Sequence, residues 1–298
     1  MDIIPEQQPY IQEINADWYE GKVTEVSMLR LDAVHHQVSG NKWYKLKYNV
    51  EYCRSHGIGT ILTFGGAYSN HLAATAAMAN ISGLKSIGVI KGTYAEKELT
   101  PTLRFCRDNG MELVFVTHED YARKYDEDWL RYLSARFNYP MIIPEGGANE
   151  YGRKGAREIA ELIPERFTHV AVSVGTGTTL TGIVDNVGGD VRVLGFAPMK
   201  GGKYLQNEIS KYVPAMNFTI YDDWHFGGFG KHTAELVVFM NQFYLENNIP
   251  LDMVYTAKMM YGLQTRILAG GYEKASKILC LHTGGLQGNV SIKDKLIY

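Results

Sequence analysis

Lys42 lies in the segment SGNKWYKLKY (residues 39–48), where its type and position suggest nucleophilic chemistry. Gly40 interrupts the preceding pattern, and Lys42 falls at the start of a helical one. The positive end of a helix dipole there favours a neutral amine, which can attack a carbonyl group and form a Schiff base. An ordinary surface lysine is the alternative, and it suits the neighbouring Lys45 and Lys47 better. Residue type and position therefore make Lys42 a candidate nucleophile and leave both interpretations open.

A phosphate-binding loop is predicted in VGTGTTLTG (residues 174–182), between a strand and a helix. Its glycines expose backbone N–H groups at a helix N-terminus and its threonines add hydroxyl groups, which suits a phosphate. The loop lacks the GK[ST] ending of a nucleoside-triphosphate loop, and leucine stands at the third glycine position of a dinucleotide fingerprint. A glycine-rich turn without a ligand is the alternative. A bound phosphate would therefore belong to a phosphorylated cofactor.

Four further segments carry groups that could line a site. In FGGAYSNHLAATAAM (residues 64–78), Ser69 and Asn70 stand at the N-cap of a small-residue helix, where they could bind a carboxylate or a ring oxygen or simply cap the helix. The segments HFGGFGKHTAE (residues 225–235) and MVYTAKMMYGL (residues 253–263) offer an aromatic ring, the phenol of Tyr255 and the hydroxyl of Thr256. In HTGGLQGN (residues 282–289), His282 is more often a structural histidine than a catalyst.

The elements that must position these residues alternate between strands and helices. Short apolar runs predict buried strands at residues 60–66, 85–92, 112–118, 140–146, 169–175, 191–198 and 277–285, with helical patterns such as 70–79 and 153–163 between them. Nearly continuous apolar strands that alternate with helices indicate an α/β fold with parallel sheets covered on both faces. Ligands bind at the carboxyl ends of such strands, where the turns FGGAYSN, EGGAN, VGTGTT and HTGG stand.

Composition excludes several other classes of protein. The chain has 298 residues, a formal net charge of -2, 45% hydrophobic and 21% charged residues. Near-neutral charge argues against nucleic-acid and membrane partners, and no apolar run is long enough to span a bilayer. The polar N-terminus is wrong for a signal peptide, so we expect a cytoplasmic protein. Three widely spaced cysteines predict buried thiols, and we expect no metal site.

In combination, G-N-K followed by K-L, G-G-x-x-S-N-H, the Gly/Thr loop, V-Y-T and H-T-G-G resemble the fold-type II enzymes that use pyridoxal 5'-phosphate (PLP). The resemblance is to the branch of 1-aminocyclopropane-1-carboxylate deaminase and D-cysteine desulfhydrase, and it runs from about residue 23 to residue 290. It implies a two-domain, tryptophan synthase β-like α/β fold with parallel-rich sheets covered by helices. A large PLP-binding domain would span residues 1–46 and 146–298, a small inserted α/β domain residues 47–145, and the protein would be a homodimer.

The same resemblance implies a role for each candidate residue. Lys42 would bind PLP covalently, Asn70 would bond the ring hydroxyl oxygen, and Thr256 would bond the pyridine nitrogen. The phosphate would be held by Gly175, Thr176, Gly177, Thr178 and Thr179. Ser69 and Tyr255 would join Lys42 in catalysis, and the small amino-acid substrate would be bound by Ser69, His71, Phe229 and Thr283.

Thr256 and Thr283 decide the expected reaction. In the deaminase branch a glutamate follows the tyrosine and a leucine stands at the position of Thr283, so this sequence resembles the desulfhydrase side. The expected activity is a PLP-dependent lyase that converts D-cysteine to pyruvate, ammonia and sulfide by β-elimination. The alternatives are a cyclopropane amino acid deaminase and a PLP-binding protein with little turnover, which Phe229, in place of a usual tyrosine, would favour. A nucleotide-binding protein would leave Lys42, Asn70 and the HTGG turn unexplained.

Overall fold

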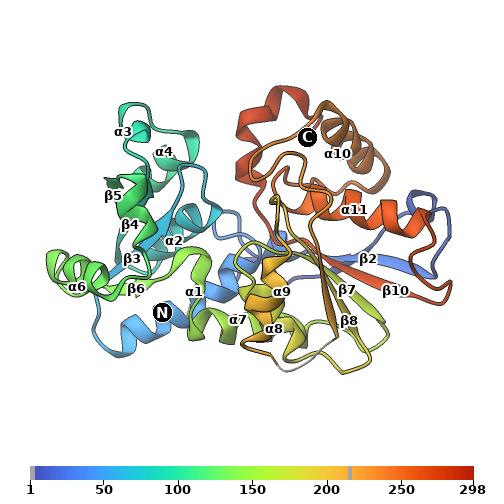
Figure 1. Cartoon of the computed structure of the whole chain (residues 1–298), viewed down its shortest axis with the longest axis horizontal. Coiled ribbons are helices and arrows are strands. Elements are labelled where there is room, and N and C mark those ends of the chain that lie inside the picture. The colour runs from blue at the N-terminus through green and yellow to red at the C-terminus, as the bar shows by residue number, and fades with distance from the viewer. Residues whose placement is uncertain (1–3, 214–216) are drawn as a thin grey trace. The chain divides into compact units, whose positions relative to one another are not determined.

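The computed structural model describes residues 4–213 and 217–298. The chain forms two compact units, one made of residue 4 and Lys42–Gly155 and the other of Pro5–Asn41 and Ala156–Tyr298. It passes from one to the other within helices α1 (Asn41–Ser55) and α7 (Glu150–Glu161) (Figure 1). The expected domain limits at 46/47 and 145/146 stay a prediction, and residues 1–3 and 214–216 of those ranges lie outside the described residues.

The unit that begins at Lys42 contains a four-stranded parallel sheet of order β5-β4-β3-β6. Its further elements are β3 (Thr60–Gly65), α2 (Asn70–Ile81), β4 (Lys85–Lys91), α3 (Tyr94–Lys97), α4 (Pro101–Asp108), β5 (Met111–Val116), α5 (His118–Ala122), α6 (Glu127–Arg136), β6 (Met141–Ile143) and η3 (Glu145–Gly147).

Helices cover both faces of this sheet. Successive strand residues point to opposite faces. On one face Leu72 of α2 packs so closely on Gly88 that a Cβ there would lie 3.2 Å from Leu72 Cδ2. On the other face Phe64 packs in a cluster with Tyr121 of α5 and Leu133 of α6. Burial on both faces explains why the strands are apolar almost throughout.

The second unit contains a six-stranded sheet of order β1-β2-β10-β7-β8-β9, in which only the β1–β2 pair is antiparallel among the described strands. Its elements are β1 (Ile11–Glu13), η1 (Ala16–Tyr19), β2 (Glu25–Leu29), η2 (Leu31–Val34), β7 (His169–Ser173), α8 (Thr178–Val184), β8 (Arg192–Phe196), α9 (Tyr204–Ser210), β9 (Phe218–Tyr221), α10 (Ala234–Asn247), α11 (Thr256–Leu268), β10 (Lys277–Leu281) and η4 (Leu286–Lys295).

This sheet is also buried on both faces. Adjacent residues of β8 show the two sides, because Gly195 meets Leu180 of α8 while Phe196 meets Gly262 of α11. In Figure 1, α10 and α11 lie along the same side of β10 and β7. A large apolar cluster fills that side and includes Phe196, Met259 and Leu263. Both sheets are thus sandwiched between helices, as the apolar strands predicted.

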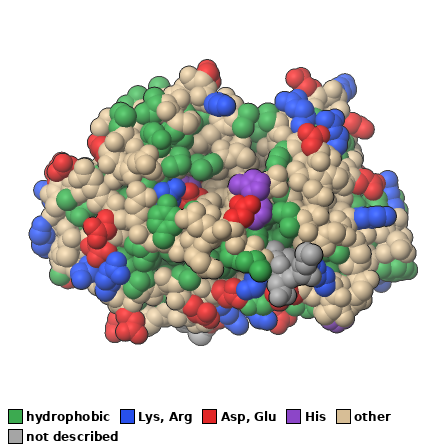
Figure 2. Space-filling model, turned by 180° about the vertical axis from the view of Figure 1, so that it is seen from behind, with side chains coloured by type: hydrophobic (Ala, Val, Ile, Leu, Met, Phe, Trp, Pro, Cys, Tyr) green, Lys and Arg blue, Asp and Glu red, His purple; other side chains and the backbone are tan. Residues whose placement is uncertain are grey.

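Two surface properties complete the fold. Acidic and basic side chains are intermixed over the face drawn in Figure 2, so opposite charges partly cancel there. Within the described residues, no helix has both the length and the apolar character to cross a membrane.

Candidate functional site

Two of the expected ligand-binding turns lie next to each other in the second unit. Strands β7 and β10 are neighbours and parallel, so their carboxyl ends meet at one edge of the sheet. The Gly/Thr loop follows β7, and the HTGG turn follows β10. Segment 39–41, which precedes Lys42, reaches the same edge, since a Cβ at Gly40 would lie 2.0 Å from the carbonyl oxygen of Thr283. Only glycine fits there.

Asn41 connects this edge to the Gly/Thr loop. Its Nδ2 donates to Thr179 Oγ1 at 2.7 Å, and both side chains are buried. Asn41 directly precedes Lys42, so the residue beside the candidate lysine is fixed to the candidate phosphate loop. The sequence shows the GNK triplet, but nothing in it signals a bond to a residue 138 positions away.

The loop itself has the geometry of an anion site. Gly177 ends it at the N-cap of α8 with φ 84°, a conformation that suits glycine. The first N–H groups of a helix have no intrahelical acceptor, so those of α8 remain available to a phosphate. Thr176 Oγ1 lies 3.0 Å from Thr178 Oγ1. Gly175 borders Tyr255, since a Cβ there would lie 3.5 Å from the tyrosine Cε1.

Gly177→Ala is expected to weaken PLP binding by about tenfold, because alanine is strained at positive φ by roughly 1–2 kcal/mol. Its Cβ would also lie 2.9 Å from Ile209 Cγ1. A titration with PLP followed by absorbance measures the effect. Gly188→Ala is the matched control, because a Cβ at Gly188 meets nothing within 4 Å. Equal affinities of the two variants would contradict the assignment of Gly177 to the phosphate loop.

Tyr255 and Thr256 are held at the start of α11 by a buried carboxylate. Asp252 Oδ1 accepts from the N–H groups of Val254 and Tyr255 at 3.1 and 2.8 Å, and Oδ2 accepts from that of Thr256 at 2.7 Å. Asp252 is fully buried. Asp252 was not predicted from the sequence, although an aspartate shortly before a helix is a known capping signal.

The hydroxyl of Thr256 provides a test of whether PLP fits this unit. Thr256 is fully buried, and among the described residues its Oγ1 has no hydrogen-bond partner. A buried hydroxyl without a partner is unfavourable unless a ligand satisfies it. The pyridine nitrogen of PLP is such a partner, and the glycine and threonine loop suits its phosphate. The residues of this unit therefore fit the cofactor. Phe229, 49% exposed, lies with its ring 6.0 Å from that of Tyr255.

The other unit contains Lys42 and the turn that carries Ser69 and Asn70. Lys42 is the second residue of α1, as the sequence predicted. Ser69 is the N-cap of α2, where its side chain accepts from the N–H of Leu72 at 3.3 Å, and Asn70 is the first helical residue. The turn follows β3, whose neighbour β6 leads into the EGGAN turn. Two more glycine-rich strand ends therefore lie side by side.

Lys45 is buried, so its interpretation from the sequence was wrong. We expected a surface lysine, but Lys45 is 4% exposed and its Nζ donates to the carbonyl oxygen of Gly146 at 3.0 Å. Burial lowers the pKa of Lys45 well below its ordinary 10.5, and the positive charge of Lys42 lowers it further. A carbonyl from the EGGAN turn makes this burial possible, and a local sequence pattern does not reveal that contact.

His71 is a buried neutral ring near Lys45, since a Cβ at Gly147 would lie 3.4 Å from Lys45 Cβ and 3.6 Å from His71 Cε1. Thr63 Oγ1 donates to the carbonyl oxygen of Ile143 at 2.7 Å, so it accepts from His71 Nε2–H at 2.8 Å. His71 is 3% exposed, and its Nδ1 has no hydrogen-bond partner within the described parts of the chain. Burial lowers its pKa well below 6.5, and the charges of Lys42 and Lys45 act in the same direction.

The buried His71 makes stability depend on pH. Its folded pKa is depressed, so below about pH 6.5 the unfolded chain binds a proton that the fold excludes, and the free energy of unfolding falls by up to about 1.4 kcal/mol per pH unit. We expect His71→Gln, which can still donate to Thr63, to reduce this loss between pH 7.5 and 5.5 in denaturant titrations. His56→Gln, at an exposed position, is the control. An unchanged pH dependence in His71→Gln would exclude His71 as its source.

His282 and the cysteines have the structural character that the sequence predicted. His282 is fully buried, its Nε2 contacts the carbonyl oxygen of Pro250 at 2.7 Å, and its Nδ1 accepts from the N–H of Gly284 at 3.3 Å. Both ring nitrogens are satisfied. Cys53, Cys106 and Cys280 are buried free thiols. Burial raises the pKa of Cys53 to about 11 and that of Cys106 to about 12, so these two stay protonated.

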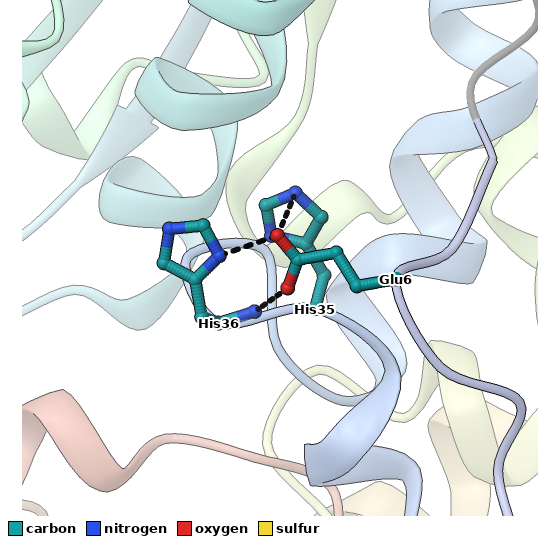
Figure 3. A group of neighbouring side chains, drawn as sticks. All are labelled: Glu6, His35 and His36. Carbon is teal, nitrogen blue, oxygen red and sulfur yellow. Dashed lines mark hydrogen bonds and ion pairs between the residues drawn. The ribbon is translucent and has the colours of Figure 1, made fainter.

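Glu6, His35 and His36 place three potential metal ligands within 4.8 Å of one another (Figure 3). However, His35 Nδ1 accepts from the N–H groups of Gln37 and Val38, so the proton of the neutral ring lies on Nε2, which faces Glu6. Glu6 also accepts from the N–H and the Nδ1 of His36 at 2.8 and 2.6 Å. These contacts join the N-terminal segment, which carries Glu6, to the segment that leads to α1.

Comparison with known proteins identifies the chemistry for which this geometry is suited. The family described as pyridoxal-phosphate dependent enzyme matches residues 27–284. The chain belongs to this family. PLP is therefore its cofactor, and the enzyme has the α/β fold with parallel-rich sheets that the sequence predicted.

This PLP enzyme is similar to several named proteins. It is 29% identical to a putative 1-aminocyclopropane-1-carboxylate deaminase of Pyrococcus horikoshii, over 100% of this chain and 95% of that protein. It is 26% identical to a D-cysteine desulfhydrase of Klebsiella pneumoniae, over 88% of this chain and 87% of that protein. The crystal structure of an ACC deaminase homologue superposes with a TM-score of 0.84 at 27% identity, covering 99% of this chain and 96% of that one.

Proposed function

We propose that this PLP enzyme is a lyase that eliminates sulfide from D-cysteine and releases pyruvate and ammonia. The observation that carries the proposal is Thr256, whose buried hydroxyl has no partner among the described residues. The nearby carboxylate of Asp252 binds the backbone N–H groups of residues 254–256 with both of its oxygens. A hydroxyl beside the pyridine nitrogen does not enforce its protonation.

When bound, PLP withdraws electrons from the Cα atom of the amino acid attached to it. Thr256 would keep this electron sink mild, which suits a substrate whose β-substituent leaves promptly. We assign the covalent link to Lys42, the ring oxygen to Asn70 and the phosphate to residues 175–179. In the substrate, the Cα proton leaves and the Cβ–S bond breaks with its electron pair going to sulfur, so that a Cα=Cβ double bond forms. Cβ then takes up a proton and becomes the methyl group of pyruvate, and water replaces nitrogen at Cα, which releases ammonia.

The remaining candidates are assigned to the substrate. Ser69, with the N–H groups at the start of α2, suits the substrate carboxylate, and Tyr255 supplies a phenol able to hold or move a proton near Cα. We assign substrate contacts also to Phe229 and Thr283. His71 is assigned to the same site, where its burial suits support of the Ser69 turn. A homodimer and a cytoplasmic location remain predictions.

The direct test is to supply the PLP-loaded protein with D-cysteine and to measure sulfide and pyruvate. Release of both in equal amounts supports the lyase, and L-cysteine in parallel reports stereochemical preference. Absence of both products would contradict the proposal that D-cysteine is the substrate.

The same assay, repeated with the cyclopropane amino acid as the substrate, tests two alternatives. The name of the Pyrococcus relative favours the cyclopropane amino acid as a substrate, and a ring-opening deaminase would release ammonia and a four-carbon 2-oxo acid from it. A PLP-binding protein with little turnover would release products from neither. In that case Phe229→Tyr, which restores a phenol beside Tyr255, is expected to raise turnover.

A further inference from the structure

Lys258 occupies a position that is unfavourable for a charged side chain. It lies in the first turn of α11, is 2% exposed, and donates from Nζ to the carbonyl oxygens of His225 and Gly228 at 2.9 and 2.7 Å. Burial lowers the pKa of Lys258 to about 8, which the carboxylate of Asp252 partly opposes. The first turn of a helix also disfavours a cation. Methionine would fill this space at lower electrostatic cost, so the two carbonyl contacts must explain the lysine.

The segment that accepts these bonds has a backbone that needs support. Phe226, Gly227, Gly228 and Gly230 have φ values of 48°, 91°, 115° and 66°. A non-glycine residue at positive φ is strained, and glycines are the most mobile residues in the unfolded chain. The N–H of Lys231 donates to the carbonyl oxygen of Gly228 at 3.1 Å, and that of Gly227 donates to His225 Nδ1 at 2.9 Å. The N–H of Gly228 donates to the carbonyl oxygen of His225 at 2.9 Å and closes the turn. The ammonium of Lys258 binds that same carbonyl.

One face of α11 holds this segment and also presents the candidate site. Tyr255, Lys258 and Gly262 follow one another at spacings of three and four, so they share a face of the helix. Gly262 packs against Trp224, and Tyr261 packs its ring against that of Phe226 at 5.0 Å. Phe229, on the same loop, places its ring 6.0 Å from that of Tyr255. Along the helix, Lys258 lies between Tyr255, whose ring contacts Phe229, and Tyr261, whose ring contacts Phe226.

We propose that Lys258 is a positioning residue that fixes loop 225–230, and with it Phe229, beside Tyr255, and thereby sets how tightly the substrate is bound. The inference rests on the proposed function where it assigns Phe229 and Tyr255 to the substrate. The anchoring of the loop depends only on contacts within one unit of the chain.

The first measurement is hydrogen–deuterium exchange of the PLP-loaded protein without substrate. Lys258→Met, which keeps the volume and removes the donor, is expected to speed exchange in residues 225–231 by about tenfold. Lys258→Arg keeps a charged donor and is expected to stay near the unsubstituted protein, as is Lys293→Met at an exposed position. Unchanged exchange in Lys258→Met would overturn the anchor, whatever the reaction proves to be.

The second measurement separates positioning from a merely structural role. Lys258→Met is expected to raise KM for D-cysteine by about tenfold and to lower kcat by less than about threefold. Lys258→Ala should regain a low KM with n-propylammonium, which replaces the missing atoms, but not with n-propanol. A tenfold fall in kcat with KM unchanged, or no rescue despite an intact PLP spectrum, would show that Lys258 does not set how tightly the substrate is bound. If the unsubstituted enzyme releases no product from D-cysteine, the proposed function fails and the exchange result still decides the anchor.

Discussion

Lys42→Ala is expected to abolish the visible absorbance of lysine-bound PLP and to lower turnover by about 10³-fold or more, since no other amine would replace the covalent link. Lys42 is the second residue of α1, directly after Asn41, which is bonded to Thr179 of the Gly/Thr loop. The substitution keeps Asn41 and its bond to the loop. We therefore expect the variant to fold and to retain weak, non-covalent affinity for PLP.

The control lysines sharpen this prediction. Lys47→Ala changes a partly buried lysine of the same helix and is expected to keep the absorbance band and the activity. Lys45→Ala removes the buried partner of Gly146, so it should reduce stability and activity without removing the band. A Lys42→Ala protein that keeps both the absorbance band and the activity would show that another residue is the nucleophile.

The sequence predicts the parts of the fold that its apolar runs define. Each of the seven expected strands has a counterpart within a few residues, because a strand buried on both faces must be apolar throughout. β1 and β9 were missed since they are edge strands of the second unit and only three and four residues long, too short for an apolar run. β2 was missed because Glu25 and Ser27 interrupt its apolar pattern, although Ser27 is fully buried and bonded to Glu25.

The local positions of the candidate site residues were predictable only where residue type and helix boundary coincide. Lys42 at a helix start and Ser69 at an N-cap are such positions, since residue type and helix boundary are both visible in the sequence. Lys45 and Lys258 are not, because each is bound by backbone carbonyls 101 or about 30 positions away. A local pattern shows that a lysine is present but not which carbonyl oxygen accepts its hydrogen bond.

Asp252→Asn is expected to lower the free energy of unfolding by about 3 kcal/mol and to weaken PLP binding. The carboxylate accepts from three backbone N–H groups, at the positions of Val254, Tyr255 and Thr256. An asparagine of the same shape offers one acceptor oxygen, and its amide N–H₂ would face a backbone N–H. Two donors cannot bond each other, so one buried N–H loses its partner and the two remaining bonds lose charge assistance.

The functional consequence follows because the residues that lose support are those assigned to the cofactor and substrate. Thr256 would no longer be held by its N–H, so its hydroxyl would be less well placed for the pyridine nitrogen. Denaturant unfolding measures stability, and PLP titration well below the unfolding midpoint measures the site. Asp294→Asn, at an exposed position of the same unit, should change neither. A destabilised Asp252→Asn with unaltered PLP affinity would show that the start of α11 is held by its packing, and that Asp252 contributes to the fold without positioning the cofactor.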